Sequence, residues 1–475
     1  MSLLLVANIA PIVFQSQGII MLRFLGCFLL TGYLSQVSAM PPIQELQLKN
    51  DFKILVVENH QSPVVYTSIW YRVGSSDEPN GLTGISHMLE HMMFRGTKKF
   101  PDGVFKQRIA ELGGEQNAMT SDDFTAYYQL LSADALPTAM KLEADRMQYL
   151  LPDESSFKKE HAVVMEERHM RVDDDPQGLT WLHFNAAAFI NSPYHQPTIG
   201  WMPDIKQYTL QNIMEWYGHW YAPNNAEMIV VGDVKPSEVF RLANHYFANI
   251  PKKTLPKMKH KTEIPSYGLR QVSVNRSAQL PWIVLGYNVP TLAQLPKEDR
   301  WQAYALYLAA MLVSEDNSGR FAQHLIRQKQ LVSDASAWYG LSNRYSSLWV
   351  AEATPAKGQT LDAVQKGLLS EMTLLGSELV SSSELARIKQ QVIAAHTFSK
   401  DSLEDEAEML GEAEMSGISW EEVMAFDKRI QAVTSSQIQY VAQHYFQSAR
   451  CTIATLTPDH PMKPTKSPLH LGDQP

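Results

Sequence analysis

Two histidines and a glutamate stand within five consecutive residues, as His87, Glu90 and His91 in the stretch HMLEH. On a helix, side chains four positions apart share a face, so the two imidazoles can bind one ion while Glu90 flanks it. Neutral imidazole suits zinc, and a catalytic zinc site has three protein ligands and one open position. The motif therefore predicts a zinc site that needs one more ligand. The alternative is an amphipathic core helix that buries Leu89 and Met92 and carries two polar histidines.

A candidate third ligand lies on a second expected helix, residues 157–169, which is rich in helix formers and is closed by Pro176. Glu160 and Glu167 are seven residues apart and share one face of that helix. This face can present one carboxylate to the ion and hold the other beside the ligands, whereas Glu166 is rotated by about 100° and points aside. For each glutamate, the alternative is a charged and solvated helix surface.

Three further segments follow the two expected helices or lie between them. They read GGEQNAMT at 113–120 with Asp123, Thr125 and Tyr127 after it, YAPNNA at 221–226, and VGD at 231–233. Together with H-x-x-E-H and a glutamate 76 residues after His91, these segments resemble the pitrilysin, insulin-degrading enzyme and mitochondrial processing peptidase family, in its bacterial half-size form.

The resemblance implies that His87, His91 and Glu167 bind one Zn²⁺, that Glu90 is the general base, and that Glu160 assists beside the ligands or in the transition state. A carboxylate near a zinc-activated water can take its proton and pass it to the leaving amine. The expected function is therefore a zinc metalloendopeptidase that hydrolyses peptides or unfolded polypeptides. One alternative is a non-catalytic or weakly active partner subunit that assembles with an active family member. A structural zinc site is another, but it would need a fourth ligand, and none is evident.

Residues 117–120 alternate like a strand after two glycines, and Thr125, Tyr127 and Tyr128 predict a second strand beside it. Members of the family hold their substrate as an added strand at this edge, a mode in which main-chain hydrogen bonds give affinity. The resemblance thus assigns substrate contacts to Asn117, Ala118 and Thr120. An ordinary hairpin of the sheet is the alternative.

The N-terminal 39 residues carry Arg23 as their only charged side chain. We expect an export signal within residues 1–39, with translation starting at Met21, followed by Arg23, an apolar stretch at 24–30 and the small-residue cleavage site Val37-Ser38-Ala39. We expect a periplasmic or secreted protein with no stable membrane span after cleavage. An uncleaved anchor is the alternative, although the apolar stretch is short for the ~20 residues of a span. Cleavage would leave Cys451 as the single cysteine, so we expect no intrachain disulfide.

Length and composition fit two domains. The 475 residues, 45% of them hydrophobic, can form two cores, and the net charge of −9 argues against a nucleic-acid partner. Lysines and prolines predict a solvated linker at 251–265. We expect a catalytic zinc domain at 42–250, a metal-free related domain at 266–462 and a tail at 463–475.

A faint internal repeat supports two related domains. Four residues of the first half recur at matching spacing in the second: Ile205, Thr209, Ile213 and Tyr221 as Ile430, Thr434, Ile438 and Phe446. Strands at 54–57 and 64–71 are expected to open the first domain, and a strand at 282–287 the second. The predicted fold class is α+β, with helices packed on a mainly antiparallel sheet in each domain.

The second domain is expected to bind no metal, because residues 304–312, at the place of the zinc helix, hold no histidine or glutamate. In active family members this domain often supplies an arginine and, seven residues later, a tyrosine. Here Arg327 is followed at that distance by Asp334. Tyr339, Tyr345 or a partner subunit remain candidates to complete the site. Because full-length relatives have four such domains, the resemblance also implies pairing into a homodimer or a heterodimer with a related chain.

Overall fold

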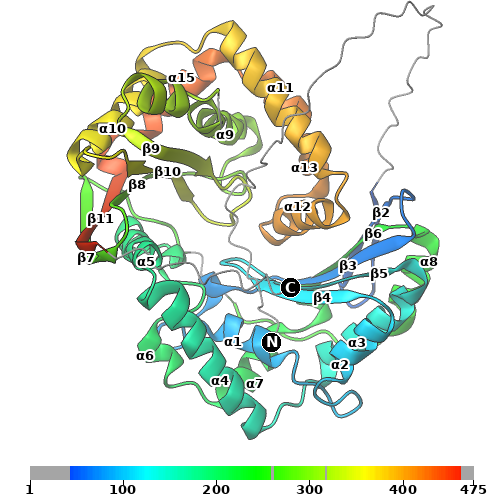
Figure 1. Ribbon diagram of the computed structural model, residues 1–475. Helices are drawn as coiled ribbons and strands as arrows, with labels where there is room; N and C mark the ends of the chain where they lie inside the picture. Colours follow the sequence, from blue (N-terminus) through cyan, green and yellow to red (C-terminus); the bar gives the residue numbers. More distant parts are fainter. Residues whose placement is uncertain (1–42, 258–260, 316–317, 462–475) are drawn as a thin grey trace, which may run out of the picture.

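Two β-sheets divide the chain into two halves of like build (Figure 1). The computed structural model describes residues 43–257, 261–315 and 318–461, so the expected export signal and tail lie outside it. The first sheet has the order β1-β2-β6-β3-β5-β4 and the second the order β7-β11-β8-β10-β9. The strands of the first sheet are β1 (Gln44–Gln47), β2 (Lys53–Glu58), β3 (Val64–Tyr71), β4 (Glu115–Thr120), β5 (Thr125–Ser132) and β6 (Ala226–Gly232). Those of the second are β7 (Arg270–Ala278), β8 (Trp282–Val289), β9 (Val332–Tyr339), β10 (Ser347–Pro355) and β11 (Cys451–Pro461).

The helices are distributed over the faces of these sheets. The first half contains α1 (Ile85–Met92), α2 (Val104–Glu111), α3 (Leu136–Tyr149), α4 (Glu154–Arg168), α5 (Pro176–Ala188), α6 (Met202–Ile205), α7 (Leu210–Trp220) and α8 (Pro236–Phe247). The second contains α9 (Trp301–Ser314), α10 (Leu361–Ser377), α11 (Ser382–Ser399), α12 (Leu403–Met415), α13 (Trp420–Met424), α14 (Phe426–Ala432) and α15 (Ser435–Tyr445). No helix in these described ranges is long and apolar enough to cross a membrane.

The internal repeat is visible in the strand order. Apart from β1, the strands of the second sheet follow one another as their counterparts do in the first, and in each sheet only one pair, β2–β6 or β7–β11, is parallel. The matching helices α7 and α15 both begin with a capping box, at Thr209 and Thr434, and both bury an isoleucine completely, Ile213 and Ile438. The expected α+β fold with two related domains and mainly antiparallel sheets is confirmed.

The start of the second sheet corrects one prediction. Strand β8 begins at Trp282, as expected, but it does not open the second half, because β7 precedes it. β7 is an edge strand that pairs only with β11, and its side chains are mostly exposed or half-buried. It therefore lacks the continuous apolar run that marks β8 in the sequence.

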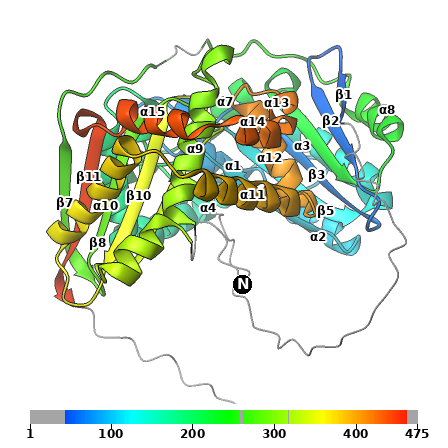
Figure 2. The same cartoon turned by 90° about the horizontal axis from the view of Figure 1, so that it is seen from above.

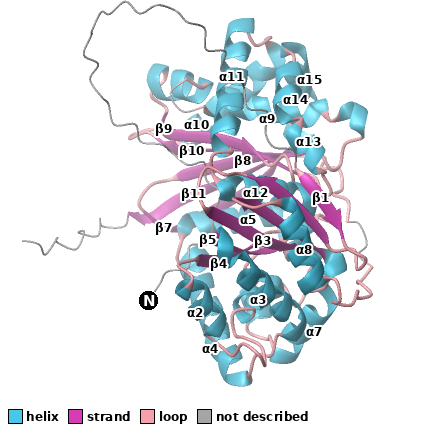
Figure 3. Cartoon of the chain, turned by 90° about the vertical axis from the view of Figure 1, so that its right-hand side faces the viewer, coloured by secondary structure: helices cyan, strands magenta, loops and turns pink. Residues whose placement is uncertain are grey.

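In each half, one helix packs on the sheet of the other half. α5 follows α4 but packs on the second sheet, where Phe184 and Ala188 join a core with Val284 and Ala454. α12 belongs to the second half but packs on β3 and β6 of the first. In Figure 3 these two helices lie between the groups of strands while other helices cover the outer faces, and Figure 2 shows the two sheets towards opposite ends of the molecule. The halves are thus interlocked.

Candidate active site

The motif helix α1 is buried along its whole length and begins at a glycine that no other residue could replace easily. Gly84 has a φ of 86°, and a Cβ at this position would lie 2.3 Å from the main-chain oxygen of Ile199. The backbone N–H groups of Gly84 and Ser86 donate to the buried carboxylate of Glu78 at 2.5 and 2.8 Å. Burial raises the pKa of Glu78 to about 8, although the bonds from Ser86 and Gly84 oppose the shift. Glu78 therefore caps the helix that carries both histidines.

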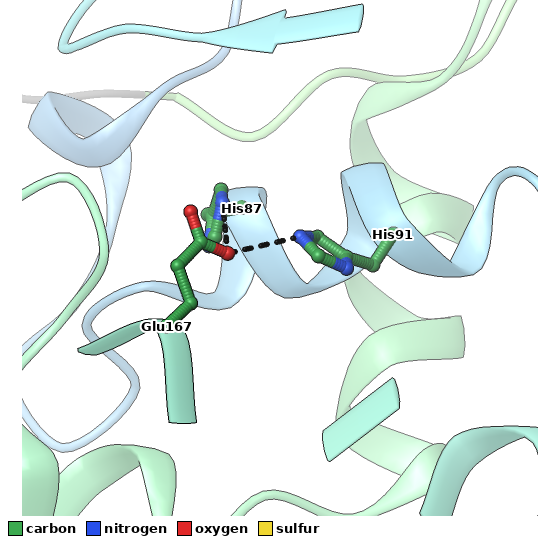
Figure 4. Close-up of side chains that lie close together, drawn as sticks. All are labelled: His87, His91 and Glu167. Carbon is green, nitrogen blue, oxygen red and sulfur yellow. Dashed lines mark ion pairs between the residues drawn. The ribbon is translucent and has the colours of Figure 1, made fainter. Parts of the chain in front are cut away.

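The structure brings His87, His91 and Glu167 together, the last from α4 (Figure 4). Glu167 Oε2 lies 3.7 Å from His87 Nε2 and 3.5 Å from His91 Nε2. In a tetrahedron with bonds of about 2.0–2.1 Å, ligand atoms are roughly 3.3 Å apart, so both separations from Glu167 are close to those of a zinc site. All three ligand atoms lie within 4.8 Å of one another, so they can close around a single ion. Within the described residues, no other group of three or more such side chains converges in this way.

The protonation states of the three side chains leave one proton, on His91, for a metal ion to displace. Burial, reinforced by the neighbouring charge of His91, lowers the pKa of His87 to about 3, so its imidazole is neutral at pH 7. Burial would also lower the pKa of His91, but its hydrogen bonds to Glu160 and Glu167 raise it to about 9. Burial raises the pKa of Glu167, yet the bond from His91 and the charge of His87 bring it to about 2. A bound cation would replace the proton on His91 and face one carboxylate and two neutral imidazoles, as zinc requires.

Two arginines hold the carboxylates around the histidines. Glu160 accepts from His91 Nδ1 at 3.1 Å and from Arg95 at 2.9 Å, so it fixes the imidazole that offers Nε2 to the ion. Burial opposes ionisation of Glu160, but the His91 bond and the Arg95 charge outweigh it and lower its pKa. Arg171 pairs with Oε1 of Glu167 at 3.0 Å, which leaves Oε2 towards the histidines.

Glu90 lies on α1 between the two candidate histidine ligands in the sequence, and its side chain is buried. Thr120 Oγ1 donates to Glu90 Oε2 at 2.5 Å. Burial raises the pKa of Glu90, while the charge of His91 and the bond from Thr120 oppose that shift. A carboxylate with a raised pKa, held in one orientation, has the properties of a general base.

Thr120 ends β4, the edge strand of the first sheet. β4 pairs on one side with β5, where Ala118 faces Tyr127 across the ladder, and no strand in the described part of the chain pairs with its other side. An edge of this kind can pair with an extended peptide. Ala118 is buried, so only its backbone is available at this edge, whereas Asn117 and Thr120 are half-buried. The hydroxyl of Thr120, for which the resemblance implies a substrate contact, donates to Glu90.

The two tyrosines that are candidates to complete the site, Tyr339 and Tyr345, lie in different environments. The buried Tyr339 hydroxyl donates to the main-chain oxygen of Pro290, so it is engaged within its own half. Tyr345 lies at the junction of the halves, where its backbone N–H donates to the hydroxyl of Tyr194. At the place of the motif helix, α9 is filled with buried apolar side chains.

Three contributors to this site were missed in the sequence. Arg171 follows Glu167 by four residues, a helical spacing that could have signalled the ion pair. Glu78 and Arg95 carry no comparable signal, because their partners depend on how a loop and a second helix pack against α1. Glu166 is exposed, as expected from its rotation on the helix.

Comparison with known proteins places this geometry in a family. Residues 53–201 match the model of the insulinase family, peptidase family M16, and residues 207–392 match that of the peptidase M16 inactive domain. The zinc protease PqqE of Helicobacter pylori is 30% identical over 431 residues, which cover 89% of this chain and 94% of the relative. The chain belongs to peptidase family M16. The beta subunit of the mitochondrial-processing peptidase of Blastocladiella emersonii is 23% identical, over 90% of this chain and 91% of that protein.

Solved structures of M16 proteins share the fold. A protease from Helicobacter pylori has a TM-score of 0.82 at 29% identity, covering 88% of this chain and all of that one. The periplasmic protease PqqL from Escherichia coli has a TM-score of 0.74 at 19% identity, covering 89% of this chain but 48% of that one. This M16 chain thus corresponds in length to the first protease and to about half of the second.

Proposed function

We propose that the chain is a secreted zinc metalloendopeptidase that cleaves peptides or unfolded polypeptides. The observation that carries the proposal is the convergence of His87, His91 and Glu167. Glu90 lies on the same helix as the two histidines and is held by Thr120. Kinship with proteins named zinc proteases supports the same chemistry.

The roles of the residues follow from their contacts. When bound, zinc would polarise the scissile carbonyl and acidify a water molecule. Glu90 takes a proton from that water as it attacks and delivers it to the leaving amine, while Thr120 keeps the carboxylate in place. Glu160 and Arg95 hold the ring of His91. The outer edge of β4 aligns the peptide through main-chain hydrogen bonds at Asn117, Ala118 and Thr120.

Replacing the base tests this function without removing a ligand. Purified wild-type and Glu90→Gln proteins would be analysed for zinc and incubated with an internally quenched peptide library, with and without a chelator. We expect about one zinc per chain in both proteins, chelator-sensitive cleavage by the wild type, and a loss of at least ~10²-fold in the variant. Full activity of Glu90→Gln would show that another group is the base.

A non-catalytic partner subunit is the second candidate, and the aspartate at position 334 favours it, because active relatives often have tyrosine there. Subunit 1 of the cytochrome b-c1 complex of Bos taurus is also similar in sequence, 24% identical over 46% of this chain. Zinc without cleavage by the pure protein, and cleavage once a co-purifying related chain is added, would select this function.

We also propose that two chains pair, alike or related, because the longer PqqL spans about twice the length of this chain. Mass measurement in solution would show twice the chain mass, or a related second chain. For localisation, we propose export to the periplasm or beyond, supported by Arg23, the apolar stretch after it and the site at Val37–Ala39. Sequencing the mature N-terminus should then give Met40, whereas Met1 or Met21 would contradict cleavage.

A further inference from the structure

The loop between β9 and β10 inserts one arginine of the second half into the first. The Arg344 guanidinium donates to both carboxylate oxygens of Asp77, at 3.0 and 3.2 Å, and to the main-chain oxygen of Asp123. The Arg344 backbone N–H also donates to Asp123 Oδ2 at 2.9 Å. Both aspartates are buried, so the contact is an internal ion pair with several directed hydrogen bonds.

The two aspartates belong to segments that already touch each other. Ser75 N–H donates to the main-chain oxygen of Ser121 at 3.2 Å, and Ser76 Oγ donates to Asp123 Oδ1 at 3.1 Å. A Cβ on Gly74 would lie 2.3 Å from the Ser121 oxygen, so this approach excludes a side chain. Arg344 therefore clamps the loop after β3 to the β4–β5 turn.

That turn leads directly to the base. Asp123 is the third residue after Thr120, and the turn is closed by a hydrogen bond from Ser121 N–H to the Phe124 oxygen at 2.8 Å. Thr120 in turn donates to Glu90. A shift of the turn would move the Thr120 hydroxyl and release the carboxylate.

From this chain of contacts we infer that Arg344 is a positioning residue: the metal-free half holds Glu90 in its working orientation through the β4–β5 turn and Thr120. The inference rests on the proposed function, because Glu90 must act as the base. It assigns the second half a catalytic contribution that needs neither a metal ligand nor the tyrosine absent at position 334.

The test combines kinetics with a readout independent of turnover. Arg344→Gln, Arg344→Lys, Thr120→Val and the double variant Arg344→Gln/Thr120→Val would be assayed for kcat, KM and zinc content. Amide hydrogen exchange would be followed over residues 115–132. Arg320→Gln is the matched control, since it breaks another two-pronged arginine pair, to Glu384 at 2.9 Å for both contacts, within the second half.

We expect Arg344→Gln to lower kcat by about 10- to 100-fold at unchanged zinc content, because small misplacements of a catalytic group have effects of this size. In the Thr120→Val background the same change should lower kcat by less than about twofold, since the link is already broken. Arg344→Lys should recover part of the loss while keeping the charge. Exchange over 115–132 should accelerate in Arg344→Gln, whereas Arg320→Gln keeps its kcat and its exchange in this segment.

If the wild type cleaves peptides and Glu90→Gln does not, the proposed function stands, and any one of three results would overturn only the inference about Arg344. The first is a folded Arg344→Gln variant with wild-type kcat. The second is a double variant whose loss in kcat is the full product of the losses from Arg344→Gln and Thr120→Val, and the third is unchanged exchange over 115–132 in Arg344→Gln. A wild-type chain that binds zinc and cleaves nothing would instead overturn the proposed function and this inference with it.

Discussion

The two halves of this M16 chain have the same strand order but differ at the helix that follows the third strand of the shared order. In the first half that helix, α1, is eight residues long and carries His87, Glu90 and His91. In the second, α9 has fourteen residues, and its buried side chains are apolar apart from Gln302 and the hydroxyl of Tyr304. The comparison shows that one sheet scaffold serves either a polar site or an ordinary core.

Burying the polar helix requires compensation that the apolar helix does not need. Around α1, Glu78 caps the N-terminus, and Arg95 and Arg171 neutralise the carboxylates that face the histidines. Around α9 most neighbours are aliphatic and aromatic side chains, and the polar contacts are few: Tyr304 donates to Glu422, and Gln302 accepts from Tyr445. Buried charges are retained only where they are paired and hydrogen-bonded, so this polar shell is itself a sign that the first half does chemistry.

Removing the Glu167 carboxylate, the candidate ligand from α4, should abolish zinc binding and peptide cleavage in the first half. Glu167→Ala is expected to lower bound zinc to well below one per chain and peptide cleavage by at least ~10³-fold, because a catalytic zinc site needs three protein ligands. Metal analysis and the quenched-peptide assay check both. Glu166→Ala, one residue earlier and exposed, should match the wild type; equal losses in the two variants would mean that the helix, not the ligand, matters.

Loosening a ligand should have a smaller effect than deleting one. Glu160→Gln removes the charge that holds His91 but keeps similar size, so we expect zinc affinity or activity to fall by about 10- to 100-fold. Competition with a chelator measures the affinity. An unchanged affinity and rate would show that Arg95 and packing alone orient the ring.

The contacts of α5 and α12 with the opposite sheets can be tested by their contribution to stability. A Cβ on Gly411 of α12 would lie 2.1 Å from the buried Trp70 ring, while one on Gly286 of β8 would lie 2.7 Å from the tip of Phe184. Overpacking typically costs about 1–3 kcal/mol. Gly411→Ala should therefore lower the free energy of unfolding more than Gly286→Ala, although alanine is the better helix former. Denaturant unfolding compares them, and the reverse order would contradict the stated contacts.

The smallest expected effect is that of the Glu412 carboxyl group on α12, the helix that packs on the sheet of the first half. Burial raises the pKa of Glu412 from its usual 4.5 to about 7. Its stability contribution is therefore fully present below pH 4.5 and is lost as the pH rises through 7, since the unfolded state gives up the proton first. Glu412→Gln should thus raise the melting temperature at pH 8, by about 1 °C per kcal/mol gained in a chain of this length, and have little effect at pH 4.5. The exposed Glu298→Gln is the control; equal shifts at both pH values would exclude titration as the cause.

The comparison also shows which features a sequence can reveal. The motif spacing of His87 and His91 was enough to predict a shared face, and the repeated Thr209 and Thr434 starts predicted related halves. These signals are local, or recur at a fixed distance along the chain. Arg344 acts on residues that only the tertiary fold brings near. Glu78 reaches Gly84 and Ser86 across a loop that has no recognisable spacing pattern, and the packing of α5 and α12 on the opposite sheets leaves no periodic trace. The second half's first strand was missed because an exposed edge strand lacks an apolar run.

The most direct measurement of the central claim is a crystal structure of the zinc-loaded protein with anomalous scattering recorded at the zinc absorption edge. The account predicts a single strong peak in each first half, within about 2.0–2.2 Å of a nitrogen of His87, a nitrogen of His91 and an oxygen of Glu167, and none beside α9. Zinc bound elsewhere, or a peak that lacks Glu167 among its ligands, would contradict it.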